Sequence, residues 1–142
     1  MLEAKNGIGT EENVLPRELA NQEINSWLDK KKIKKSQREE NKASVDMLVE
    51  AFMDGSLTLN KDTNVLTLNL LFPENMGITK LDFRSRMNDA ILHPHLNGVK
   101  PTDVDGRINA LICALTTQPK NIITILDSSD KRVAQSIAIF FL

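Results

Sequence analysis

The side chains best suited to chemistry in this sequence are one cysteine, two neighbouring histidines and two aspartates near the C-terminal end. Cys113 lies in an apolar helical pattern and has no basic neighbour at helical spacing that would lower its pKa. We therefore expect it to be a small buried hydrophobic residue, and a single cysteine cannot form an internal disulfide.

His93 and His95 flank a proline and could share a metal ion. Structural or catalytic zinc needs three or four protein ligands, and no cysteine or acidic residue stands at matching spacing, so we expect two loop histidines. Asp127 and Asp130 have the spacing of a carboxylate pair, but they precede a helical run, and helix capping is the simpler interpretation. The sequence also lacks a glycine-rich phosphate loop, a nucleophile elbow and an HExxH motif. It therefore predicts a protein that is not an enzyme and has no cofactor, no metal and no catalytic residue.

The basic run from Lys30 to Lys35 offers point charges that could contact phosphates. It stands between two expected helices, and Glu39 and Glu40 partly offset it, so a solvated turn is the favoured interpretation. A nucleic-acid-binding helical module centred on this run is a less favoured alternative, and nucleic acid is not the expected partner.

The three C-terminal helices could also form a helix-turn-helix, in which the last helix reads DNA. Near its start that helix offers only Lys131, Arg132 and Gln135, and the rest is mostly apolar. Such a composition is typical of a core helix, so we do not favour DNA reading.

Composition limits the class of protein further. The 142 residues are 41% apolar, which is enough for one core without metal or disulfide support. The net charge of −1 gives no global field toward nucleic acid or anionic lipid, and 4% aromatic residues argue against a base-stacking platform. We find no apolar signal segment and no run long enough to cross a bilayer, so we expect a cytoplasmic protein without membrane contact.

Periodicity divides the chain into a polar tail, 1–14, expected to be disordered, and a single mostly helical domain, 15–142. The domain begins with a helical pair, 16–55, whose first helix runs from Pro16 to about Lys31. The second helix is capped by Ser36 with Glu39 and ends near Gly55. The first half of this second helix is wholly polar and should project into solvent or meet a partner.

The period then changes from about 3.6 to 2, which predicts a β-hairpin at about 57–72 with a polar loop at 60–64. Two strands alone are marginally stable, so helices or a second chain must cover the leucine face, which gives a local reason for self-association. Residues 78–87 suit either a strand or a helix, and we favour a turn leading into a helix at 83–92.

The remaining helices complete the C-terminal region, 83–142. Thr102 with Asp105 caps a helix whose apolar side runs from Val104 to Leu115, Pro119 opens a short helix, and Asp127 caps the last one. The expected fold class is α+β, predominantly helical, with one β-hairpin.

From Leu57 onward the order of features resembles the tail assembly chaperones of tailed bacteriophages. Proteins of that family commonly combine an early strand pair with a segment I-x-x-L-x-x-R, helices, L-x-x-L-T-x, I-x-x-L-D-x-x-D and an amphipathic helix ending in Phe-Leu. The matching stretches are 78–84, 112–116 with Ile in place of the first leucine, 123–130 and 140–142. The helical pair before Gly55 exceeds the usual short lead-in of the family.

The resemblance implies a non-catalytic phage tail assembly chaperone or morphogenesis factor. Such a protein binds the tape measure protein or a baseplate protein in the host cytoplasm and keeps the long apolar helices of the tape measure soluble. Some relatives form oligomers. The alternative is a structural tail, baseplate or adaptor component of the virion.

The chain's own amphipathic faces are compatible with holding a partner helix in a groove. The candidate partner-binding residues are Trp27, Leu28, Phe52, Phe140 and Phe141. The same faces could instead pack against one another.

Overall fold

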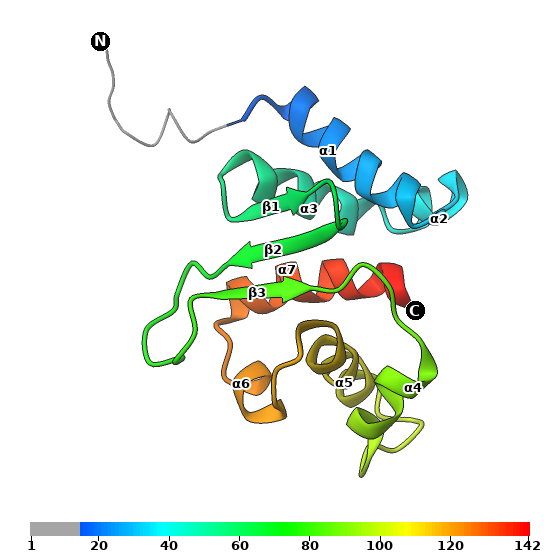
Figure 1. Ribbon diagram of the computed structural model, residues 1–142, viewed down its shortest axis with the longest axis vertical. Helices are drawn as coiled ribbons and strands as arrows, with labels where there is room; N and C mark the ends of the chain where they lie inside the picture. The colour runs from blue at the N-terminus through cyan, green and yellow to red at the C-terminus, as the bar shows by residue number, and fades with distance from the viewer. Residues whose placement is uncertain (1–14) are drawn as a thin grey trace.

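Helices gather on one side of a small sheet in the computed structural model, which describes residues 15–142 (Figure 1). The predicted disordered tail, 1–14, lies outside the described residues. Between 15 and 142 the fold is α+β and predominantly helical, as predicted. The elements are α1 (Arg17–Lys30), α2 (Lys35–Glu40), α3 (Lys42–Met53), β1 (Leu57–Asn60), β2 (Val65–Asn69), β3 (Lys80–Phe83), α4 (Asp89–Leu92), the 3₁₀ helix η2 (His93–Leu96), α5 (Val104–Thr116), α6 (Lys120–Thr124), α7 (Ser128–Ala138) and the 3₁₀ helix η3 (Ile139–Phe141).

The predicted hairpin forms, with Leu57 opposite Leu68 and Asn60 opposite Val65. A third strand, β3, pairs antiparallel with β2 and gives the order β1-β2-β3. The prediction of a turn and a helix from 83 was therefore wrong at this point, because Leu81 and Phe83 are both only 1% exposed on the inner face of the sheet. Burying two such side chains contributes about 3–6 kcal/mol, whereas helix propensities differ by less than about 1 kcal/mol per residue.

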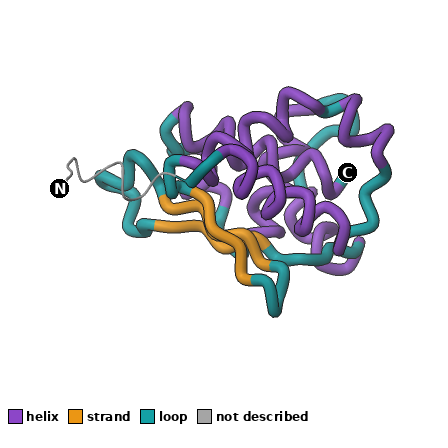
Figure 2. Tube along the Cα trace, turned by 90° about the horizontal axis from the view of Figure 1, so that it is seen from above, coloured by secondary structure: helices purple, strands orange, loops and turns teal. Residues whose placement is uncertain are grey.

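The helices cover only one face of this sheet (Figure 2). Leu66 and Leu68 of β2 point into the core, whereas Thr67 points outward and donates a hydrogen bond to Asp82 at 2.6 Å. The leucine face of the hairpin is thus covered by helices of the same chain, which removes the local reason for self-association.

The N-terminal helical pair differs from the prediction in one respect. The second helix is not continuous from 36 to 55, because it breaks at Asn41 into α2 and α3. Arg38 holds α2 against the end of α1, since its guanidinium bonds Asn25 Oδ1 at 3.0 Å and Asp29 Oδ1 at 2.7 Å. Lys34, not Ser36, occupies the N-cap position of α2. Local periodicity could not reveal these contacts with α1.

The C-terminal helices lie close to their predicted positions. The cap of α5 is Asp103, which accepts a hydrogen bond from the Gly106 amide at 2.9 Å, and not Thr102 as predicted. Val104 was expected on the apolar side of α5 but is 65% exposed. The predicted helix at 83–92 shrinks to α4, which Asn88 caps by accepting a hydrogen bond from the Ile91 amide.

Candidate partner-binding surface

Four of the five candidate partner-binding residues lie in the core. Trp27, Leu28, Phe52 and Phe140 are each at most 5% exposed. Trp27 meets the ring of Phe140 edge to face, with centroids 6.0 Å apart and an interplanar angle of 89°. The amphipathic faces of α1, α3 and the C-terminal segment therefore pack on one another, and this fold does not offer these four side chains to a partner.

Phe141, the fifth candidate, stays half-buried at the surface, where the ammonium of Lys31 lies 3.3 Å from its ring centroid. The same Nζ lies 5.6 Å from the ring centroid of Trp27. Both rings stabilise the charged lysine through cation–π attraction. Burial and the nearby Arg86 act in the opposite direction and lower the pKa of Lys31 to about 8.

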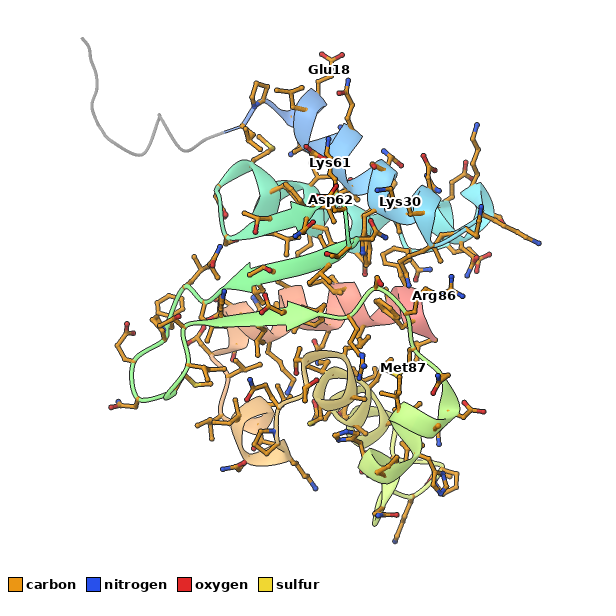
Figure 3. All side chains as sticks on the ribbon, viewed as in Figure 1. Glu18, Lys30, Lys61, Asp62, Arg86 and Met87 are labelled. Atoms are coloured by element: carbon orange, nitrogen blue, oxygen red, sulfur yellow. The ribbon has the colours of Figure 1, made fainter. Side chains whose placement is uncertain are left out.

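This position distinguishes Lys31 from the rest of the lysine run, which was predicted to be a solvated turn. Lys32, Lys34 and Lys35 are exposed, in agreement with that prediction. Lys30 donates a hydrogen bond to the Lys61 carbonyl of the hairpin loop, and Figure 3 shows both residues beside α1. Sequence reasoning missed the separate role of Lys31, because no local signal connects it with the ring of Phe141.

An apolar hollow of about 390 Å³ opens between α3, α5 and α7. Met47 of α3, Ile108 of α5 and Ile139 of η3 line its apolar wall, and all three are only partly buried. Asp105 and Arg132 supply charged side chains to the lining. We call this hollow the helical groove. Met47 precedes the buried Leu48 of α3, and periodicity did not single it out.

A second hollow, of about 260 Å³, adjoins the helical groove because Leu111 and Leu142 line both. We call it the C-terminal hollow. Leu92 of α4 and Phe141 contribute further apolar surface to it. Leu142 is 78% exposed between the two hollows. Together they form an extended apolar depression, which is the usual form of a site for an amphipathic segment of another protein.

The two aspartates that suggested a carboxylate pair have different roles. Asp127 caps α7 by accepting a hydrogen bond from the Ser129 amide at 2.9 Å, as predicted. Asp130 does not cap the helix. Asp130 is only 1% exposed, and its carboxylate accepts hydrogen bonds from the amides of Leu71 at 2.9 Å and Phe72 at 3.1 Å. It therefore joins α7 to the chain leaving β2.

The remaining side chains that could do chemistry are Cys113, His93 and His95. Cys113 is buried, as predicted, and that burial raises the pKa of its thiol. His93 and His95 are exposed on η2. Within residues 15–142, no three His, Cys, Asp or Glu side chains gather in a way that could hold a metal ion.

In the described part of the chain, no helix combines the length and apolar character needed to cross a bilayer. Comparison of the sequence with protein-family models and with curated proteins, and of the fold with solved structures, gave no match.

Proposed function

We propose that this chain is a phage tail assembly chaperone or related morphogenesis factor, which binds a tape measure or baseplate protein without catalysis. The observation that carries the proposal is the helical groove, whose apolar wall and charged lining suit one face of an amphipathic helix. In the family that the sequence resembles, the chaperone keeps the long apolar helices of the tape measure protein soluble.

The arrangement of the resembling segments supports the same proposal. The segment 78–84 contains β3, and the Arg84 amide that follows the strand donates a hydrogen bond to the Leu115 carbonyl in segment 112–116 at 3.0 Å. Segment 123–130 carries both Asp127 and Asp130, which fix the start of α7. The hydrogen bond from Arg84 to Leu115 thus joins two of the segments that resemble the family.

Co-expression with the tape measure or baseplate protein tests the proposal. The expected result is a soluble complex that co-purifies with the tagged chain. Ile139→Arg should abolish the complex, because it places a charge in the apolar wall of the helical groove, and Gln135→Arg should weaken it at an exposed lining position. Ile125→Arg is the matched control, since Ile125 is 56% exposed and does not line the helical groove.

Thermal melting of each variant separates loss of binding from loss of folding. A partner that remains insoluble, with no co-purifying complex, would contradict the proposal. Mass spectrometry of finished particles addresses the structural alternative: a chaperone should be absent from them, and stoichiometric presence would favour a virion component.

A further inference from the structure

Three basic side chains from separate parts of the chain lie in or near the C-terminal hollow, and of these Arg107 belongs to its described lining. Lys31 reaches it from the end of α1 through its contact with Phe141, and Arg107 lines it from α5. Arg86, on the segment between β3 and α4, lies near enough to Lys31 to repel its charge, and Figure 3 shows Arg86 beside the C-terminal end of the fold.

These cations are poorly balanced by the protein itself. Among residues 15–142, none of the three forms a salt bridge. Asp89 is the only carboxylate side chain in the described lining of the C-terminal hollow, so basic side chains outnumber acidic ones when Lys31 and Arg86 are counted with Arg107. By contrast, other charged side chains of α1 form salt bridges: Arg17 pairs with Glu50, and Asp29 pairs with Arg38.

The half-buried position of Lys31 beside Arg86 disfavours its charged form when no partner is bound. Desolvation of the ammonium and repulsion from Arg86 lower its pKa, and the rings of Trp27 and Phe141 offset this only in part. An incoming carboxylate would offset both unfavourable contributions by its attraction to the ammonium and to the neighbouring cations, and this attraction is stronger in a partly desolvated setting.

The surroundings of the three cations favour a protein segment over nucleic acid. Leu92, Leu96 and Leu111 give the hollow an apolar lining, which fits leucine-like side chains and not a sugar-phosphate backbone. In addition, the net charge of −1 provides no long-range attraction for a polyanion.

We propose that the C-terminal hollow binds an acidic, apolar-rich segment of the protein partner, with its carboxylates on Lys31, Arg86 and Arg107 and its apolar side chains against Leu92 and Leu96. This inference rests on the proposed function and names the chemistry of the partner at one end of the same depression. The segment recognised is therefore a helix or strand that carries both Glu or Asp and Leu-like residues.

A binding measurement with a short fluorescein-labelled peptide tests this. The probe is a helical peptide with glutamates along one face and leucines along the other, measured by fluorescence anisotropy against the full chain. The comparison peptides carry lysine in place of glutamate, or serine in place of leucine, and a short duplex DNA is the nucleic-acid probe. Only the Glu/Leu peptide should bind well.

Variants locate the site. Lys31→Met keeps the aliphatic packing on Phe141, and Arg86→Gln changes an exposed side chain, so both should fold. Each should weaken the Glu/Leu peptide about tenfold, because loss of one partly desolvated ion-pair partner has an effect of this order. Lys34→Met is the matched control from the same lysine run, and its affinity should stay within about twofold of the wild type.

Several outcomes would overturn the inference. They are failure of the Glu/Leu peptide to bind, equal binding of the DNA, or equal affinity of all variants for the peptide. If the tape measure complex forms but is unaffected by Lys31→Met and Arg86→Gln, the proposed function stands and this inference fails. If the peptide binds at this site but no tail protein does, the inference stands and the proposed partner is wrong.

Discussion

Asp127 and Asp130 begin the same helix three residues apart, yet the structure predicts very different effects when each is changed to asparagine. Asp127 is exposed and caps α7, whereas Asp130 is buried and binds the amides of Leu71 and Phe72 through separate carboxylate oxygens. Asparagine is about as good an N-cap as aspartate, so Asp127→Asn should change the free energy of unfolding by less than about 0.5 kcal/mol.

Asp130→Asn removes one of two acceptors and directs an amide N–H₂ at a backbone N–H. A hydrogen bond to a charged group contributes about 1.5–3 kcal/mol, and an unsatisfied buried donor adds to the loss, so we expect a destabilisation of about 2–3 kcal/mol. For a chain of this size the melting temperature should fall by about 5–10 °C. Both variants remove one negative charge from the first turn of α7, so their difference does not include the helix-dipole contribution.

Urea unfolding followed by the fluorescence of Trp27, the single tryptophan and only 1% exposed, measures both free energies. Hydrogen exchange gives a second, local measurement, because the amides of Leu71 and Phe72 should exchange faster in Asp130→Asn than in Asp127→Asn. Equal destabilisation by the two substitutions, or unchanged exchange at Leu71 and Phe72, would refute the role given to Asp130.

Three further predictions concern single side chains. Cys113, with its buried thiol and raised pKa, should react with a thiol reagent far more slowly in the native chain than in denaturant, and comparable rates under both conditions would contradict its burial. Thr117 follows α5 with φ of 55° and is exposed, so Thr117→Gly should raise the free energy of unfolding by about 1 kcal/mol; a loss of stability in urea titration would show that the left-handed backbone is not strained there. Lys31 has its pKa lowered from 10.5 to about 8, so the unfolded chain binds more protons between these values, and the stability of the wild type relative to Lys31→Met should rise as pH increases from 8 toward 10.5. A stability difference that is flat across this range, in denaturation at a series of pH values, would rule out the lowered pKa.

Local patterns in the sequence were enough to identify most elements of the fold. The apolar spacing of α1, α5 and α7, the alternation of the hairpin and the cap at Asp127 all depend on neighbours within a few residues. Such signals reflect the periods of helix and strand, which act at short range. The burial of Cys113 followed from the same apolar pattern around it.

The candidate site depends instead on contacts between distant parts of the chain. The strand β3 exists because Leu81 and Phe83 bury against β2, and a segment with ambiguous periodicity takes the structure that its partner strand offers. Contacts between distant residues also decide the roles of Asp130, which the sequence assigned to helix capping, and of Lys31, which the sequence did not distinguish from its neighbours. Asp130 could be distinguished from a helix cap only by the approach of Leu71 and Phe72, which are 59 and 58 residues away in the sequence.

The sequence by itself determined that the chain is a mostly helical α+β protein and where most of its helices and its hairpin lie, because those depend on local periodicity and capping. Only the tertiary structure decided which apolar faces remain open. Trp27 and Phe140 close on each other in the core, while Phe141 stays at the surface with Lys31 on its ring. The physical reason is that exposure is a property of packing between elements, and the sequence pattern records only which faces are apolar.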